Sequence, residues 1–166
     1  MIVADIFSDK HSKKQECLEY RRYDPLSETE RSKRMSLIKE KDTKPELLVR
    51  KLIFSMGYRY RLHDKNLPGK PDIVFKSRKK AIFVHGCFWH QHGCSHYRMP
   101  KTKQAFWEEK LAKNVHRDNM HYTQLKEMGW DFLVLWECGI KKRNIGQIQA
   151  KIGNFLGSRS KKNEIR

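Results

Sequence analysis

The sequence predicts an α/β fold in which helices flank a central mixed β-sheet. Two short apolar segments, residues 71–75 and 81–85, are joined by a basic turn and are expected to pair as a β-hairpin. A third apolar run, residues 130–136, is the strongest strand pattern in the chain. Helical patterns precede, separate and follow these strands, at residues 45–56, 102–128 and 145–155. Helices and strands that alternate in this way pack as layers around a sheet.

The first helix is expected from Pro45 to Met56. Thr43 and Glu46 have the spacing of a capping box, and proline suits the first helical turn. The apolar side chains recur at helical spacing in two adjacent rows: Leu48, Leu52 and Met56, and beside them Val49 and Ile53. Gly57 follows directly and is typical of a helix end.

A half-buried strand is expected next, because Tyr58, Tyr60 and Leu62 alternate with two arginines. A turn at residues 66–69 then leads into the hairpin. The helical pattern before the last strand has two parts, and we expect Thr102 to cap the first and Gly129 to close the second. Their apolar residues are Phe106, Trp107 and Leu111, then Val115, Tyr122, Leu125 and Met128. The last helix carries Ile145, Ile148, Ile152 and Phe155 at helical spacing.

A chain of 166 residues has room for one domain with one core. We expect residues 1–29 to form a flexible arm, because they are polar and aperiodic and Asp24-Pro25 interrupts them. Residues 30–157 are expected to form the folded domain, and residues 158–166 a basic tail.

The charge of the chain indicates its class of partner. Lys and Arg number 36 against 19 acidic residues, which gives a net charge of +17. Such an excess favours a polyanion, either nucleic acid or an anionic membrane. No apolar run approaches the ~20 residues of a membrane-spanning helix, and the N-terminus is a poor secretion signal. Nucleic acid is therefore the favoured partner, and we expect no membrane association.

The segment from Val84 to His96 predicts a metal site. It holds two cysteines and four histidines within thirteen residues, and thiolate and imidazole are ligands that zinc prefers. Cysteines of a cytosolic protein are more often metal ligands or free thiols than disulfides. The residues that predict a closed, structural Zn²⁺ site are Cys87, His92, Cys94 and Cys138.

Three alternatives to this ligand set stay open from the residues alone. His90 or His96 could replace His92, and Cys17 could replace Cys138. The cysteines could also be ordinary small buried side chains, since free cysteine is often buried.

A second set of residues predicts hydrolysis of a phosphodiester. Asp72 begins one strand of the hairpin and His85 ends the other. A carboxylate can bind Mg²⁺, which polarises a phosphate, and histidine can exchange a proton near neutral pH. Asp72 could instead be only a turn residue, Glu46 only a helix cap, and Asp118 only a solvated charge.

Taken together, these segments resemble the very short patch repair (Vsr) DNA mismatch endonucleases of bacteria. The run His85-Gly-Cys-Phe-Trp-His90 is the most specific, and the matches keep their order and spacing over about residues 30–142. The matching stretches are residues 31–35, 43–46, 67–72, 83–90, 92–94, 106–107, 113–118, 129–130 and 134–138.

The resemblance implies a restriction-endonuclease-like fold and a role for each site residue. It implies that Asp72 binds Mg²⁺ together with the backbone carbonyl of Val84, a position where the best-known members have threonine. It implies that His85 and His90 are the catalytic imidazoles, with His90 as general base. Further acidic site residues are Glu46 and Asp118, the latter orienting a histidine. The implied zinc ligands are Cys87, His92, Cys94 and Cys138, which favours His92 over the other histidines.

The function implied by the resemblance is a nick 5′ to the thymine of a T·G mismatch in double-stranded DNA. Phe88 and Trp89 match aromatics that wedge into the duplex, and Met35 matches a wedge from the other groove. Two other functions fit the residues less well: a restriction-type endonuclease acting on intact sites, and a non-catalytic zinc-stabilised DNA-binding module. A protein that only binds DNA needs neither Asp72 nor the two histidines His85 and His90. We expect a monomeric protein of the bacterial cytoplasm, and we expect it to work at the nucleoid. Whether it also binds other mismatch-repair proteins stays open.

Overall fold

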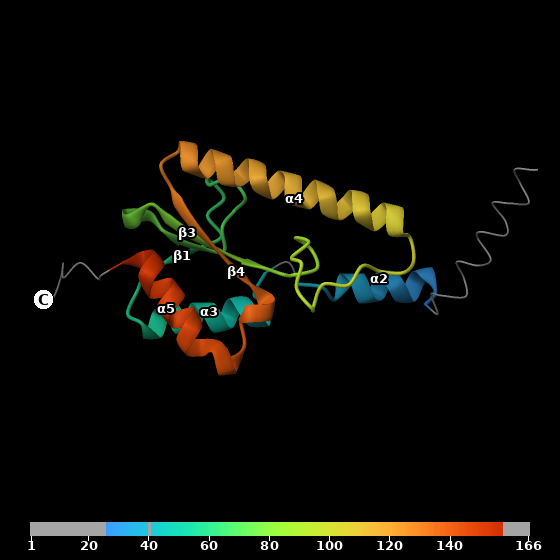
Figure 1. Ribbon diagram of the computed structural model, residues 1–166, viewed down its shortest axis with the longest axis horizontal. Helices are drawn as coiled ribbons and strands as arrows, with labels where there is room; N and C mark the ends of the chain where they lie inside the picture. Colours follow the sequence, from blue (N-terminus) through green and yellow to red (C-terminus); the bar gives the residue numbers. More distant parts are fainter. Residues whose placement is uncertain (1–25, 40, 158–166) are drawn as a thin grey trace, which may run out of the picture.

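A computed structural model of the chain describes residues 26–39 and 41–157 (Figure 1). The helices of this part are α2 (Glu28–Ser36), α3 (Lys44–Ser55), α4 (Gln104–Glu127) and α5 (Ile145–Leu156). The strands are β1 (Arg61–Leu62), β2 (Ile73–Phe75), β3 (Lys80–His85) and β4 (Asp131–Trp136). Short 3-10 turns lie at η1 (Lys76–Arg78), η2 (Glu137–Gly139) and η3 (Lys142–Asn144).

The described strands form one mixed sheet in the order β1-β2-β3-β4. β2 and β3 pair antiparallel as the predicted hairpin, with Ile73 opposite Ile82, and β1 also pairs antiparallel with β2. β3 and β4 are parallel, so α4 must connect them from one end of the sheet to the other. The predicted α/β class with a mixed sheet is confirmed.

Helices cover both faces of the sheet: α4 lies on one face, and α3 and α5 lie on the other (Figure 1). Successive side chains along a strand point to opposite faces of the sheet, so each strand contributes to a hydrophobic cluster on each face. Ile73 and Phe75 pack with the buried side of α3 and α5, whereas Val74 packs with Leu125 of α4. Burial on both faces explains why the central strands are almost continuously apolar.

The predicted helix rows of α3 are confirmed. Val49 and Ile53 are fully buried, and the other row packs against the same core. The Thr43 side chain caps α3 by accepting from the backbone N–H of Glu46.

Three expectations were wrong in detail. The two helical patterns before β4 form one continuous helix, α4. Thr102 does not cap it, because its N-cap is Lys103, which has a left-handed backbone and no side-chain capping bond. The strand predicted at Tyr58–Leu62 is reduced to β1, and Leu62 is exposed although Tyr58 is buried.

The predicted N-terminal arm falls almost wholly outside the described residues, and so does the predicted tail at 158–166. Helix α2 begins at Glu28 with a capping box on Ser27, two residues before the predicted start of the domain. Over the described residues, none of the helices combines the length and the apolar character needed to cross a bilayer.

Candidate active site and metal centre

The loop that follows β3 brings three metal-type ligands to a fourth, Cys138, just after the end of β4. The Sγ atoms of the three cysteines and a ring nitrogen of His92 lie within 4.8 Å of one another; the set is Cys87, His92, Cys94 and Cys138. His92 Nδ1 lies 3.5 Å from Cys138 Sγ. The His92 ring stacks on Trp136, the last residue of β4, with centroids 4.2 Å apart. The cluster therefore links a loop to the end of a strand far away in sequence, as predicted.

The surroundings shift the pKa values of two of the thiols in opposite directions. Burial raises the pKa of Cys87 to about 12. Burial also acts to raise the pKa of Cys94, but hydrogen bonds from the His96 backbone and the neighbouring ligands lower it to about 6. A bound dication stabilises all of these thiolates at once. Three thiols and one imidazole form the donor set of a closed structural zinc site. His90 and His96 lie outside this ligand cluster, and Cys17 lies outside the described residues.

A cleft of about 420 Å³ lies at the end of the sheet where β2 begins and β3 ends. The predicted residues Glu46, Asp72, Val84, His85, His90 and Asp118 all line it. They come from five places: the first turn of α3, the residue before β2, the end of β3, the loop after β3, and the middle of α4. The positive side chains that line it are Lys41, Lys65, Lys70 and Arg117. Such a cleft can attract a phosphate while it presents a carboxylate to a metal ion.

Asp72 is held by the neighbouring strand. Its Oδ2 accepts the backbone N–H of Val84 at 2.7 Å, and its Oδ1 lies 3.8 Å from His63 Nδ1. Burial raises the pKa of Asp72 to about 6, and the Val84 N–H and nearby Arg50 only partly oppose this. A carboxylate that is largely buried and lacks a full counter-charge fits a cation site. The observed contact uses the N–H of Val84, so a role for its carbonyl stays a prediction.

The two predicted histidines lie face to face. The rings of His85 and His90 stack with centroids 3.6 Å apart, and His90 Nδ1 lies 2.5 Å from Asp118 Oδ2. Burial, followed by the nearby His90, lowers the pKa of His85 to about 3, so His85 is neutral at physiological pH. The Tyr122 hydroxyl, whose pKa is raised by burial, lies 3.4 Å from His85 Nδ1.

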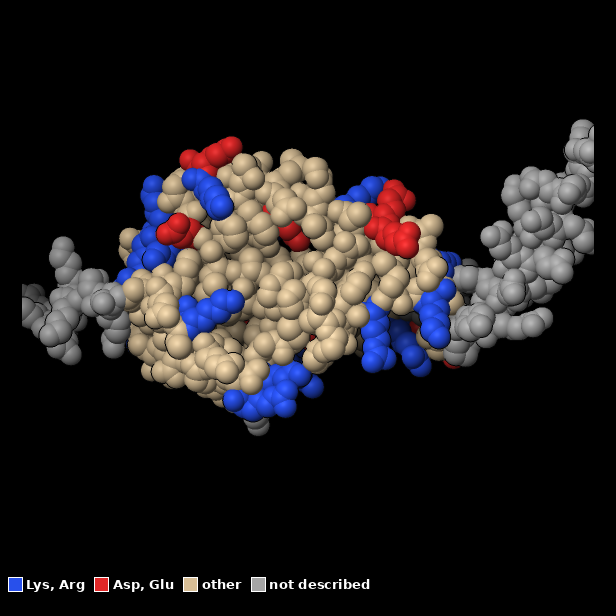
Figure 2. Space-filling model, in the orientation of Figure 1, with Lys and Arg blue, Asp and Glu red and all other residues tan. Residues whose placement is uncertain are grey.

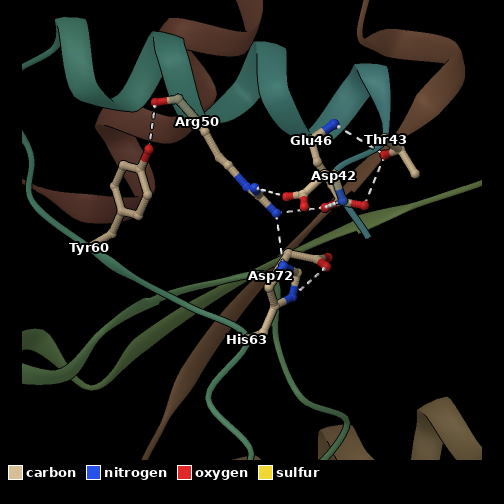
Figure 3. Close-up of polar contacts among 7 residues, drawn as sticks. All are labelled: Asp42, Thr43, Glu46, Arg50, Tyr60, His63 and Asp72. Atoms are coloured by element: carbon tan, nitrogen blue, oxygen red, sulfur yellow. Dashed lines mark hydrogen bonds and ion pairs between the residues drawn. The ribbon is translucent and has the colours of Figure 1, made fainter. Parts of the chain in front are cut away.

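Glu46 is more than a helix cap. It is 3% exposed, and its Oε2 accepts the backbone N–H of Asp42 at 3.0 Å. Arg50, one helical turn further along α3, donates to the same oxygen at 2.8 Å (Figure 3). The Thr43 hydroxyl donates to the other oxygen at 2.9 Å. Glu46 thus belongs to a buried polar network that reaches Asp72 through His63 (Figure 3).

A second cleft, of about 710 Å³, joins the first through shared residues that include Glu46 and His90. Met35 of α2 and Trp89 of the metal loop both line it. The structure does not bring Phe88 to this cleft; Phe88 faces a separate space beside the metal ligands. Phe88 and Trp89 are half-buried, with ring centroids 5.1 Å apart. They pack with Trp107, and Lys110 lies over the Trp89 ring.

Comparison with known proteins identifies the family. A sequence model described as DNA mismatch endonuclease Vsr matches residues 23–96. The Type II nicking enzyme V.XorIIP of Xanthomonas oryzae pv. oryzae is 44% identical over 133 residues, which are 80% of this chain and 96% of that protein. DNA mismatch endonuclease Vsr of Escherichia coli is 42% identical over 113 residues, which are 68% of this chain and 72% of that protein. The chain belongs to the Vsr family.

The Vsr resemblance predicted from the motifs is therefore confirmed. Sequence reasoning missed Arg50, His63, Tyr122 and Lys110, which contact the predicted site residues. A signal existed for Arg50, because Glu46 and Arg50 have the i,i+4 spacing of a helical ion pair. No local pattern marks His63, since its partners lie on α3 and at the start of β2.

Proposed function

We propose that this protein is a Mg²⁺-dependent DNA endonuclease that nicks one strand 5′ to the thymine of a T·G mismatch. The observation that carries the proposal is the cleft in which a largely buried carboxylate, Asp72, lies with a His90–Asp118 pair and a second imidazole. A DNA-binding module has no need of this arrangement. The membership of the Vsr family and the names of the relatives support the same reaction.

The cleft residues Asp72, His85, His90 and Asp118 have separate roles in the proposed reaction. Asp72, helped by the Val84 carbonyl, would hold Mg²⁺, which supplies charge to stabilise the scissile phosphate and lowers the pKa of a bound water. Asp118 accepts from Nδ1–H of His90, which leaves the other ring nitrogen of His90 to take a proton from the attacking water. His85, neutral and stacked on His90, is the second imidazole. The thiolates and His92 would hold Zn²⁺ and fix the loop that carries His90.

The second cleft supports mismatch recognition. Trp89 and Met35 line it from two separate elements, as wedges from the two grooves would require. Wedges unstack a base step at a cost of a few kcal/mol, which is smallest where pairing is already poor. Phe88 would join the wedge through its contact with Trp89. Lys and Arg side chains lie around the edges of the face in Figure 2, which suits the wrapping of a duplex.

Several further assignments belong to the same proposal. Residues 30–157 would have a restriction-endonuclease-like fold, and residues 1–29 and 158–166 would be appendages to it. The protein would be a monomer that works in the cytoplasm at the nucleoid. Other mismatch-repair proteins are a further class of partner in this proposal. A restriction-type endonuclease shares the chemistry, but it has no need of wedge residues beside the cleft.

The proposal is tested by mapping nicks. The protein and Mg²⁺ are incubated with duplexes that carry T·G in varied sequence contexts, and with matched T·A and C·G duplexes. We expect one nick, 5′ to the mismatched thymine. Cleavage of fully paired duplexes at the same rate would support the restriction-type alternative, and binding without cleavage would support the non-catalytic module.

Trp89→Ala is expected to lower the preference for T·G over paired duplex by about tenfold, because base stacking on an aromatic contributes roughly 1–3 kcal/mol. The measurement is the ratio of dissociation constants for the two duplexes in Ca²⁺. Phe54→Ala is the control, since Phe54 is an exposed aromatic at the far end of α3. If Trp89→Ala and the parent discriminate equally between the two duplexes, Trp89 does not act as a wedge.

The Mg²⁺ requirement is expected to rise as the pH falls through about 6. Only the ionised form of Asp72 binds the cation, and burial raises its pKa to about 6. At pH 5 roughly one carboxylate in ten is ionised, so about tenfold more Mg²⁺ should be needed for half-maximal nicking than at pH 7.5. Titrations of Mg²⁺ at each pH measure this separately from the maximal rate. A half-saturating concentration that does not change with pH would contradict the assignment.

A further inference from the structure

Arg50 lies at the centre of the polar network in Figure 3, and the proposed reaction leaves it without a role. Arg50 is 7% exposed and donates through Nη2 to Glu46 and through Nη1 to Asp42. Nη2 also lies 2.9 Å from Nε2 of His63. The buried guanidinium thus has two acidic partners, and it also contacts an imidazole.

The contact between Arg50 and His63 decides where the ring proton of His63 lies. Arginine has only N–H donors and no acceptor, so Nε2 of His63 must accept. A neutral imidazole that accepts at Nε2 carries its proton on Nδ1. Nδ1 is the ring atom that faces Asp72, 3.8 Å from Oδ1.

The backbone of His63 supports a fixed orientation for this ring. Its φ is +47°, a left-handed conformation that is uncommon for residues other than glycine. Its N–H donates to the backbone carbonyl of Asp72 at 3.4 Å. Tertiary contacts must hold a backbone in this region, and such positions occur often at functional sites.

One oxygen of the Asp72 carboxylate accepts a hydrogen bond, and the other faces the His63 ring. Val84 donates to Oδ2 from the paired strand, and Nδ1 of His63 lies 3.8 Å from Oδ1. The hydrogen bond, together with electrostatic attraction to a proton on Nδ1, favours one orientation of the carboxylate.

We propose that Arg50 and His63 are positioning residues for Asp72: Arg50 holds the ring proton of His63 on Nδ1, and His63 orients the Asp72 carboxylate for the catalytic cation. The proposal rests on the proposed role of Asp72 as the Mg²⁺ ligand. It also explains why the guanidinium is buried between two acids beside an imidazole.

The main alternative is a second cation site in the same place. Ligand atoms of Asp42, Glu46 and His63 lie within 4.8 Å of one another. In this structure the guanidinium of Arg50 contacts all three, so a metal ion there would have to displace a buried charge. The tests below separate the two.

The first test reads the tautomer of His63 in the full-length chain that keeps its zinc and is free of Mg²⁺ and Mn²⁺. Long-range ¹H–¹⁵N NMR at neutral pH distinguishes a protonated from an unprotonated ring nitrogen, and His63→Asn assigns the signal by its loss. We expect Nδ1 to carry the proton in the parent, and a mixture of tautomers in Arg50→Met. A parent ring with its proton on Nε2 would overturn the proposal, and this result needs no variant to fold.

The second test uses two variants that keep different parts of the ring. The amide nitrogen of Asn lies near the position of Nδ1 and can still donate toward Asp72, whereas Gln reaches only the position of Nε2. After thermal unfolding has confirmed the fold, Mn²⁺ binding is measured by calorimetry, and nicking is titrated with Mg²⁺. We expect His63→Gln to weaken both metal affinities about tenfold or more, and His63→Asn to weaken them less, at an unchanged DNA affinity.

The possible failures are distinguishable. Parent-like Mn²⁺ affinity in His63→Gln would overturn the positioning role. An extra Mn²⁺ bound by Arg50→Met but lost in Arg50→Met with Glu46→Gln would support the second cation site instead. If Asp72→Ala nicks like the parent, the Mg²⁺ assignment fails while the NMR result on His63 still stands.

Discussion

Asp72→Ala is expected to abolish nicking of a T·G duplex while the zinc content and the fold remain intact. Asp72 accepts the backbone N–H of Val84, its other oxygen lies 3.8 Å from His63 Nδ1, and burial raises its pKa to about 6. A metal ion at a phosphoryl oxygen contributes several kcal/mol to the transition state, so the rate should fall by about three orders of magnitude or more. Single-turnover nicking with saturating protein measures this loss directly.

Asp131→Ala is the matched control for this variant. Asp131 is an exposed carboxylate of the same sheet, at the start of β4 and therefore at the opposite end from His85. It should nick like the parent. Normal cleavage by Asp72→Ala, with the same zinc content, would refute the role of Asp72 in metal binding.

Cys138→Ala is expected to remove the zinc ion and to destabilise the whole domain. Its Sγ lies 3.5 Å from His92 Nδ1, and its backbone N–H donates to Cys87 Sγ at 3.4 Å, so it ties the loop to the end of β4. Structural zinc contributes about 10–16 kcal/mol in zinc-finger peptides, which is comparable to the stability of a whole domain. We expect the midpoint of thermal unfolding to fall by roughly 10 °C or more. Elemental analysis of the purified protein gives the metal content.

Cys17→Ala is the control that separates the two ligand hypotheses. Cys17 was the alternative fourth ligand from the sequence, and it lies outside the described residues. Its substitution should leave one zinc per chain and an unchanged unfolding midpoint. Loss of zinc from Cys17→Ala but not from Cys138→Ala would show that the fourth ligand was assigned wrongly.

The accuracy of the sequence prediction followed the strength of the local pattern. Helix α3 and the hairpin were predicted well, because the apolar rows of α3 and the two strand runs both face a core. Helix α4 was read as two pieces since it buries fully only Leu111 and Leu125 in 24 residues, which leaves little periodic signal between them. Its start was misplaced because Lys103, a residue with no capping side chain, occupies the N-cap.

The site was predictable where its residues follow one another in the chain. The residues from His85 to Cys94 form a motif so specific that it indicated the family, and the structure brings Cys138 to the same cluster. Arg50 and His63 were missed because their contact depends on how α3 packs beside the start of β2. The separation of Phe88 from the cleft of Met35 and Trp89 was missed for the same reason, since adjacency in sequence does not say which way each ring points.

Crystals of the protein grown with Mn²⁺, with anomalous diffraction recorded at the manganese and zinc edges, would locate both metal ions. We expect a manganese peak within bonding distance of an Asp72 oxygen, beside the stacked rings of His85 and His90, and a zinc peak among the three cysteines and His92. A manganese ion bound to Asp42 and Glu46 instead, with Asp72 empty, would contradict this expectation.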